Sequence, residues 1–541
     1  MKRRMMALML VLSMVVTLFT GCTSDEMGLW NLAKETNDIA IYESNVNIDI
    51  DVEKLFELID KESEKLGNEL TTEQKEVLGK VRMFLKENSI QFVVKYDKNE
   101  VQSTIEVNLI SKATGQKEAF TTVIVKDEKI YINVEQMIGY LTNKGFYNSD
   151  ELLNNSGESM KYIMIDLNSI AAEGFTEFSL KNEISKSQAL QEKYIDFADE
   201  LVKTVFKDFS TGKVEKLGTN SYSMSMNGEE MINTLFDGII YVINNYDGFA
   251  DAVVKFINSL TDEELNQLNF GSSKEEIAQG FTESKQYVNE NKAMTIAQIE
   301  QSKEIIKNEE YKPILESIKM VYLLNKQNAT YSDNLNIQMN LVPIINMQIK
   351  QTNAMLEAGY EGRKTMRDFN MLGNNEENVN EEVEEPVYQE LLTGDYNIGI
   401  TVTSTTKAMS NLEVTAPTEG VVDIKDVKNH VKQKMNVKID NGEFDQIVAG
   451  MPLPNDGETL DIKVVDDYSY LPMRQLAENL GEKVGWDNDM KKAYITRENN
   501  NLIYVDGIII DDHTYIKVRE LEKLGYKVNW NETTREVGIE K

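Results

Sequence analysis

Apolar and polar residues alternate in short runs along the first part of the chain. Val46, Ile48 and Ile50 are separated by Asn47 and Asp49, and this period of two is typical of a half-buried strand. Short polar links join most of the runs, which indicates an antiparallel meander with one polar face. The strands expected from the alternation lie near residues 46–50, 92–96, 101–109, 130–134, 162–167 and 222–226.

Helical spacing replaces the alternation in two blocks. Residues 51–66 and 72–86 are predicted to form helices, and Leu55 and Ile59 share one face of the first. From residue 228 to about residue 326 the apolar positions again follow the helical period. This long block predicts a group of helices between two sets of strands.

Strands are expected again after the long helical block. Residues 335–341 alternate strictly between apolar and polar side chains. Pro343 interrupts the run, and Ile345, Met347 and Ile349 resume it as a further predicted strand.

These patterns predict an α+β fold. A large antiparallel sheet with helices packed on one face is expected over residues 38–372, and a strand near residues 397–403 is a candidate to complete it. Residues 373–387 are glutamate-rich and almost free of large apolar side chains, which predicts an acidic linker. This segment lacks the Asp/Asn and Gly spacing of an ordered calcium loop. Residues 388–433 are expected to connect the linker to a last domain.

The last domain, residues 434–541, contains a tandem repeat. Tyr470-Leu-Pro-Met-Arg474-Gln-Leu476 recurs as Tyr515-Ile-Lys-Val-Arg519-Glu-Leu521. Gly481-Glu-Lys-Val-Gly-Trp486-Asp recurs as Gly525-Tyr-Lys-Val-Asn-Trp530-Asn. Each copy reads as a strand, a short helix, a strand, a turn and a strand, so a small tandem β-α-β domain is expected to follow the large sheet.

Leucines and glycines define the helix of each copy. Leu476 and Leu480 in the first copy, like Leu521 and Leu524 in the second, form one buried helical stripe. Gly481 and Gly525 follow these helices where a left-handed residue ends a helix at low cost.

The repeat resembles the copper amine oxidase N-terminal-like domains found in surface proteins of Gram-positive bacteria. Their pattern is a strand ending in Val-Pro-Leu-Arg, a helix, Leu-Gly and then Val-x-Trp-Asp. Pro472 keeps the proline, Lys517 replaces it in the second copy, and the match spans residues 437–541. The resemblance implies a non-catalytic stalk or wall-associated module.

Amine oxidase activity is not expected. Those oxidases hold copper with three histidines and form a quinone from a Tyr in a Thr-x-x-Asn-Tyr setting, whereas this chain has two histidines, His430 and His513. The one near-match, at Asn245-Tyr246, has Val242 in place of the Thr. No cofactor, no metal site and no other catalytic centre is predicted, although paired carboxylates leave a wall hydrolase as a remote alternative.

Four side chains of the repeat are candidates for binding a cell-wall polymer. Trp486 and Trp530 could stack on sugar rings, but their position on strands favours packing in the core. Arg474 and Arg519 could bind an anionic wall polymer, but a structural ion pair is the simpler role.

The N-terminus predicts an exported lipoprotein. A basic start precedes an apolar run over residues 5–19, which is shorter than the ~20 residues of a spanning helix. Leu18-Phe19-Thr20-Gly21-Cys22 resembles the lipobox of bacterial lipoproteins, in which the cysteine receives a lipid. The resemblance implies a signal peptide over residues 1–21, lipid attachment at Cys22, a polar tether over residues 22–37 and a place on the outer face of the cytoplasmic membrane.

The net charge and the cysteine content exclude some classes of partner and some kinds of site. The net charge is -33, and removal of the signal peptide with its three basic residues leaves -36. Such a chain repels nucleic acid, so a nucleic-acid partner is not expected. The single cysteine rules out an internal disulfide and a Cys-rich metal site.

Two hypotheses about function follow. In the first, a membrane-anchored lipoprotein binds or spaces against the cell wall through its C-terminal domain. In the second, the first domain carries a lipid or another hydrophobic ligand, because a curved sheet wrapped around helices resembles the carrier fold of periplasmic lipoprotein chaperones and mycobacterial lipid-binding lipoproteins. That resemblance rests on element order and the lipoprotein N-terminus alone, and a plain packed core is the alternative.

Overall fold

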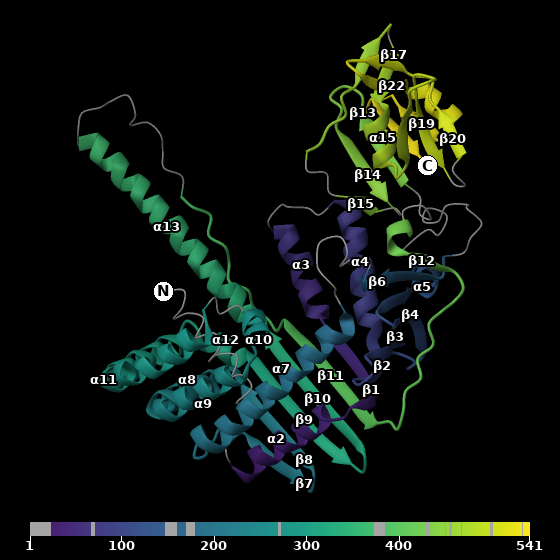
Figure 1. Ribbon diagram of the computed structural model, residues 1–541. Coiled ribbons are helices and arrows are strands. Elements are labelled where there is room, and N and C mark those ends of the chain that lie inside the picture. Colours follow the sequence, from purple (N-terminus) through teal and green to yellow (C-terminus); the bar gives the residue numbers. More distant parts are fainter. Residues whose placement is uncertain are drawn as a thin grey trace. The chain divides into compact units, whose positions relative to one another are not determined.

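The structure is a computed structural model of the 541-residue chain (Figure 1). It describes residues 23–65, 71–145, 160–168, 179–268, 272–372, 385–427, 433–448, 451–453, 457–466, 468–497, 501–532 and 534–541. The chain divides into two compact units, Met1–Ala119 with Ala171–Val414 and Phe120–Ile170 with Thr415–Lys541. The predicted signal peptide, Cys22, His430 and most of the predicted acidic linker lie outside the described residues.

The predicted α+β fold is confirmed. Its large sheet has the strand order β12-β6-β5-β4-β3-β2-β1-β11-β10-β9-β8-β7, with antiparallel neighbours throughout the first unit from β3 to β7. The strands are β1 (Ile41–Asp51), β2 (Asn88–Asp97), β3 (Gln102–Ser111), β4 (Lys117–Lys126), β5 (Lys129–Asn133), β6 (Tyr162–Asp166), β7 (Val214–Gly218), β8 (Ser221–Asn227), β9 (Ile318–Gln327), β10 (Thr330–Asn340), β11 (Asn397–Ala408) and β12 (Val421–Asp423).

The late strand β11 lies in the middle of the first unit's part of the sheet. It pairs with β1 on one side, where Ile50 is opposite Ile400, and with β10 on the other, where Ile337 is opposite Ile400. A strand near residue 400 therefore does complete the sheet, by insertion between its first strand and β10 (Figure 1).

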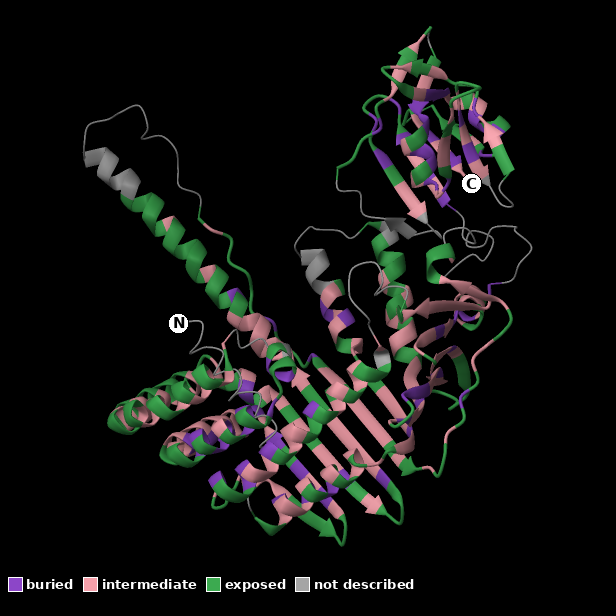
Figure 2. Cartoon of the chain, in the orientation of Figure 1, coloured by how far each residue is buried: buried purple, intermediate pink, exposed green. Residues whose placement is uncertain are grey.

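Helices of the first unit pack beside this sheet and against one another. An apolar cluster joins α7, η2, α8 and α9, and its largest fully buried side chains include Phe206, Leu201 and Ile257. The helices are α2 (Ser24–Asn37), α3 (Glu53–Lys65), α4 (Thr72–Glu87), α7 (Leu180–Glu200), η2 (Leu201–Val205), α8 (Gly228–Asn244), α9 (Tyr246–Ser259), α10 (Asp262–Gln267), α11 (Lys274–Ile306), α12 (Lys312–Ser317) and α13 (Val342–Leu372). Figure 2 shows that α11 and the coloured part of α13 are largely exposed.

The segment expected to be a polar tether is instead helix α2. Thr23 caps it, and Glu26 closes a reciprocal capping box with Thr23. Leu29 and Leu32 are buried against Tyr222 and Leu324 of the sheet. The tether prediction was wrong for residues 24–37 because only a narrow apolar stripe is needed to dock a short helix.

Two predicted element types are also corrected. Residues 318–327, expected to be helical, form β9, where Val321 and Leu323 make both faces apolar and hide the period of two. Residues 345–349, expected to be a strand, lie in α13, because Ile345 and Ile349 are also one helical turn apart and pack around Tyr396.

The second unit contains β4, β5, β6 and β12 with helix α5 (Val134–Asn143) and the short η4 (Ile424–Asp426). β12 runs parallel to β6, and Val134, Met160 and Val422 belong to one apolar cluster. Within the described part of the chain, no helix is long and apolar enough to cross a membrane.

The C-terminal module of the second unit, residues 433–541, has its own core. Its elements are β13 (Gln433–Lys438), β14 (Phe444–Val448), β15 (Met451–Leu453), β16 (Lys463–Val465), β17 (Tyr468–Pro472), α15 (Met473–Asn479), β18 (Lys483–Asp487), β19 (Lys492–Arg497), β20 (Asn501–Tyr504), β21 (Ile508–Ile510), β22 (His513–Lys517), η6 (Val518–Leu524), β23 (Lys527–Asn531) and β24 (Glu536–Glu540). They form three sheets, β15-β14-β13-β24-β23, β16-β17-β22-β21 and β18-β19-β20.

Candidate functional site

Both copies of the C-terminal repeat fold as predicted. Each runs through a strand, a short helix and two further strands, β17-α15-β18-β19 in the first copy and β22-η6-β23-β24 in the second. Leu476, Leu480 and Leu521 are fully buried in the module's core. The first strands of the two copies pair with each other, with Tyr470 opposite Lys517.

The two glycines end their helices as predicted. Gly481 has φ +70° and Gly525 has φ +88°, both in the left-handed region. A Cβ on Gly481 would lie 2.6 Å from the side-chain nitrogen of Gln433, so this glycine also allows β13 to pack closely.

The two tryptophans do not enter the core, which corrects the favoured prediction. Trp486 is 39% exposed and Trp530 is 53% exposed. Each is the last residue but one of its strand, β18 or β23, and these strands belong to different sheets. The alternation of side chains along a strand selects a face, but it does not reveal that the core stops before the end of the strand.

The two arginines lie on the surface. Arg474 forms an ion pair with Glu478 one helical turn away, at 3.4 Å, and 63% of its side chain is exposed. Arg519 is exposed on η6. An exposed pair of this kind contributes little to stability. The simpler role predicted for Arg474, a structural ion pair, describes its contact.

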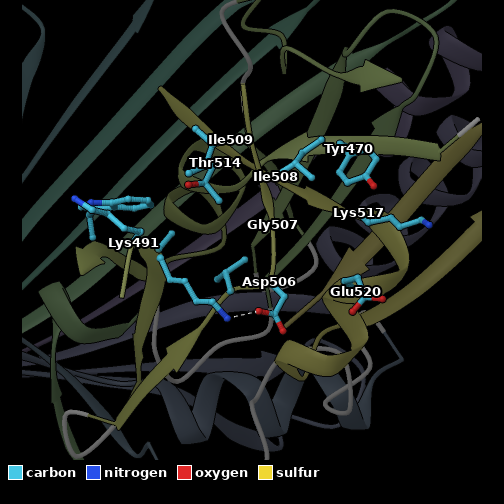
Figure 3. Close-up of a pocket in the computed structure, with 13 residues that line it drawn as sticks. Tyr470, Lys491, Asp506, Gly507, Ile508, Ile509, Thr514, Lys517 and Glu520 are labelled. Carbon is cyan, nitrogen blue, oxygen red and sulfur yellow. Dashed lines mark hydrogen bonds and ion pairs between the residues drawn. The ribbon is translucent and has the colours of Figure 1, made fainter. Parts of the chain in front are cut away.

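A pocket of about 340 Å³ lies where the first and second copies meet (Figure 3). Trp486 is part of its wall, whereas Arg474, Arg519 and Trp530 are not among its lining residues. The lining residues are Tyr470, Trp486, Lys491, Lys492, Ala493, Val505, Asp506, Gly507, Ile508, Ile509, Thr514, Lys517 and Glu520. Of the four residues predicted to bind wall polymer, the structure therefore brings one to a pocket.

Two sheets contribute residues to this pocket. β18 and β19 contribute Trp486 and Lys492 from one sheet, while β17 and β22 contribute Tyr470 and Thr514 from the other. Figure 3 shows Tyr470, Lys517 and Glu520 on one side of Gly507 and Thr514 on the other. The repeat motif indicated Tyr470 and Trp486, but no sequence pattern marked residues 505–509. That link joins the pocket through tertiary contacts, the pairing of β21 with β22 and the bonds of Val505 and Asp506 to β19.

Several charges of the pocket are already engaged. Lys492 donates to Asp506 at 2.6 Å, and this hydrogen bond lowers the pKa of Asp506. The ammonium of Lys517 lies 2.8 Å from the ring centre of Tyr468. Glu520 pairs with Lys523. The wall therefore offers mixed polar groups and an aromatic face, without a concentrated charge of either sign.

A second candidate surface is an apolar face of the large sheet in the first unit. Two cross-strand rows, here called the apolar rows, run over β1, β11, β10, β9 and β8 on the same face. One row is Ile48, Val402, Leu335, Tyr322 and Met224, and the other is Ile50, Ile400, Ile337, Met320 and Met226.

The apolar rows are buried at their β8 end and most exposed in the middle, on β10 and β11. Met224 and Met226 on β8 are buried, whereas Ile337 on β10 is 37% exposed and Ile400 on β11 is 44% exposed. Burial, together with the nearby charge of Asp333, raises the pKa of Tyr322 to about 12. The phenol is therefore neutral, and the open part of the rows presents branched apolar side chains to solvent.

Among the described residues, no group of three or more His, Cys, Asp or Glu side chains is placed to hold a metal ion. Residues 456–507, which contain the first copy of the repeat, match the copper amine oxidase N-terminal domain family. No curated protein matches the chain, and no solved structure does. The family is described as the N-terminal domain of copper amine oxidases, and the match covers only this part of the chain.

Proposed function

We propose that the protein is a non-catalytic surface lipoprotein, held at the outer face of the cytoplasmic membrane by a lipid on Cys22. In this proposal the C-terminal module spaces the first unit from the cell wall or binds the wall. The observation that carries the proposal is the pairing of a lipobox-like sequence ending at the chain's single cysteine with a stalk-type family domain at residues 456–507.

The first helix that the structure describes is compatible with the anchor. Thr23, directly after Cys22, is already the cap of α2, and α2 packs on the sheet through Leu29 and Leu32. A lipid on Cys22 would therefore hold the first unit close to the membrane surface, without a long tether. With a chain charge near -36, the lipid rather than electrostatic attraction would provide the binding energy.

Two linked measurements test this proposal. Cells that express the full chain are labelled with a fatty-acid analogue, and Cys22→Ser is expected to lose the label and to leave the membrane fraction. The chain from Thr23 is then sedimented with purified cell wall and compared with a version that ends at Val427. Labelling that persists in the Cys22→Ser variant would refute the anchor, and equal sedimentation of the two soluble versions would refute wall binding by the module and leave it as a spacer.

A second candidate function is the transport of a lipid or another hydrophobic ligand by the first unit. The observation that favours it is the open part of the apolar rows, where Ile337 and Ile400 are more than one-third exposed in the middle of a sheet. Adjacent apolar side chains left open on a sheet form a candidate surface for a hydrophobic ligand.

Charge substitutions on the two faces of the sheet test the carrier function. Ile337→Glu is expected to weaken binding of a fluorescent fatty acid at least tenfold, because it buries a carboxylate under the acyl chain. Val321→Glu is the matched control, since Val321 has the same exposure as Ile337, 37%, but pairs with Asn336 on the opposite face. No saturable binding by the unmodified protein, or equal loss in both variants, would exclude the apolar rows as the ligand site.

A further inference from the structure

The pocket between the two repeat copies has the composition of a sugar-binding site. It combines the partly exposed indole of Trp486, the phenol of Tyr470 and the hydroxyl of Thr514 with the apolar side chains of Ala493 and Ile508. Sugar rings present C–H groups on their faces and hydroxyl groups at their edges, so they need an aromatic face bordered by polar groups.

The charges on the wall favour an uncharged ligand. Lys492 is neutralised by Asp506, Glu520 by Lys523, and Lys517 lies over the ring of Tyr468, whereas Lys491 is an exposed cation at the edge of the set. A polyanion that used more than Lys491 would have to displace these contacts, and it would also approach a chain whose net charge is -33. A neutral glycan meets neither cost.

The size and the apolar lining of the pocket limit the class of ligand further. A volume of about 340 Å³ lies at the lower end of the range for small-molecule pockets and suits one or two sugar rings rather than a long segment. Ala493, Val505 and Ile508 give the pocket an apolar patch in addition to the indole. An N-acetyl group carries a methyl that can cover such a patch, together with an amide that can bond to neighbouring polar groups.

We propose that this pocket binds an N-acetylated sugar ring of a neutral glycan, with the ring stacked on Trp486 and its polar edge toward Thr514 and the Lys492–Asp506 pair. This inference rests on the proposed function, because it identifies the wall component that the C-terminal module would recognise. Both repeat copies are required, since the first supplies Trp486 and Tyr470 and the second supplies Thr514 and Lys517.

The second tryptophan provides a matched control. Trp530 occupies the same position of the second copy, is more exposed than Trp486 and is not among the residues that line the pocket. A general effect of losing a surface indole would appear in both variants, whereas loss of the site would appear only at Trp486.

The experiment uses the whole chain from Thr23 with 5-fluorotryptophan at its tryptophans and the neutral tetramer of N-acetylglucosamine as the probe. The ¹⁹F resonance that disappears in Trp486→Phe is expected to shift saturably with the tetramer, while the resonance assigned through Trp530→Phe stays in place. By calorimetry, Trp486→Ala is expected to weaken binding at least tenfold and Trp530→Ala less than twofold, with both variants keeping the circular dichroism of the parent.

The alternative outcomes are separable. No shift of the Trp486 resonance at millimolar tetramer, equal effects of the two alanine variants, or binding of a glycerol phosphate polymer in place of the tetramer would overturn the glycan site. Loss of wall sedimentation on removal of the module, combined with an unshifted Trp486 resonance, would leave the proposed function standing and place wall binding elsewhere on the module. Binding of the tetramer through Trp486 without any wall sedimentation would support the site and refute the wall role.

Discussion

The carboxylate of Glu26 ties the first turn of α2 to the loop before β7. It is fully buried and accepts hydrogen bonds from Thr23 Oγ1 at 2.7 Å, from Thr211 N at 2.8 Å and from Thr211 Oγ1 at 2.6 Å. Burial by itself raises the pKa of Glu26, but the hydrogen bonds from Thr211 and Thr23 outweigh it and hold the pKa below its ordinary value. The position beside the predicted lipid anchor is therefore rigid.

Glu26→Ala is expected to lower the free energy of unfolding by about 3 kcal/mol, because it leaves several buried donors unsatisfied. Urea unfolding of the chain from Thr23, followed by circular dichroism, measures the change. Asp25→Ala, at the neighbouring position of the same turn, is the control and is expected to change stability by less than about 1 kcal/mol. Equal effects of the two variants would contradict a special role for Glu26.

The carboxyl of Asp199 makes the stability of the region around α2 depend on pH. Burial raises the pKa of its carboxyl, but hydrogen bonds from Lys203, Trp30 and Lys34 lower it from 3.8 to about 2. Because the folded pKa lies below the unfolded one, Asp199 stabilises the fold above the unfolded pKa and loses this effect as the pH falls toward 2. Its contacts join α7 to α2, so acid is expected to loosen this junction.

The parent protein is expected to lose free energy of unfolding between pH 5 and pH 2, and Asp199→Asn is expected to reduce this loss by about 1–2 kcal/mol. Unfolding by urea at a series of pH values measures the slope for the parent and the variant. Asp196→Asn, an exposed position on the same helix, is the control and should retain the parent slope. A variant slope equal to that of the parent would show that Asp199 does not couple folding to protonation.

At the scale of elements, the helix ends of the repeat depend on backbone freedom. Gly481 follows α15 with φ +70°, and Gly525 caps η6 with φ +88°. An alanine there must adopt a left-handed backbone, and at position 481 it must also displace the side chain of Gln433. The two helices, and with them the buried leucine stripes, rely on glycine at these ends.

Gly481→Ala is expected to destabilise the module by about 2 kcal/mol, and Gly525→Ala by about 1 kcal/mol. Gly280→Ala has the opposite expected sign, a gain of about 0.5–1 kcal/mol, because Gly280 lies inside the exposed helix α11 with no atom near an added Cβ. Thermal unfolding measures the change in stability, and hydrogen exchange shows whether it lies in the C-terminal module or in α11. A neutral Gly481→Ala variant would mean that α15 can end without a left-handed residue.

At the scale of the whole molecule, a strand from beyond the acidic segment completes the first unit. β11 pairs along its length with β1 and with β10, although it follows them by hundreds and by tens of residues respectively. The first unit is therefore not a contiguous stretch ending near residue 372, and any truncation must leave β11 in place.

A chain that ends at Glu385 is expected to lose cooperative unfolding of the first unit, because the facing edges of β1 and β10 lose their hydrogen-bond partners. A chain that ends at Val427 keeps both β11 and β12 and is expected to unfold as cooperatively as the full chain. Limited proteolysis and urea unfolding compare the two. Cooperative unfolding of the shorter chain would show that β1 and β10 can form a stable sheet without β11.

Features that depend on local period and backbone conformation could be predicted from the amino-acid sequence. The α+β class, the strands around Ile48 and Leu335, the tandem repeat with its buried Leu476 and the helix-ending Gly481 were all predictable, because each leaves its signal within a few residues. The lipid on Cys22 stays a prediction of the sequence.

Contacts between segments that are far apart in the chain could be learned from the folded structure alone. Insertion of β11 between β1 and β10, docking of α2 through Leu29, and exposure of Trp486 in a pocket completed by Thr514 all depend on contacts between residues far apart in the chain. The alternation of apolar and polar residues indicates which side chains share a face of a strand, but not whether another element covers that face. Trp486, which was expected in the core, is therefore the central residue of the candidate site.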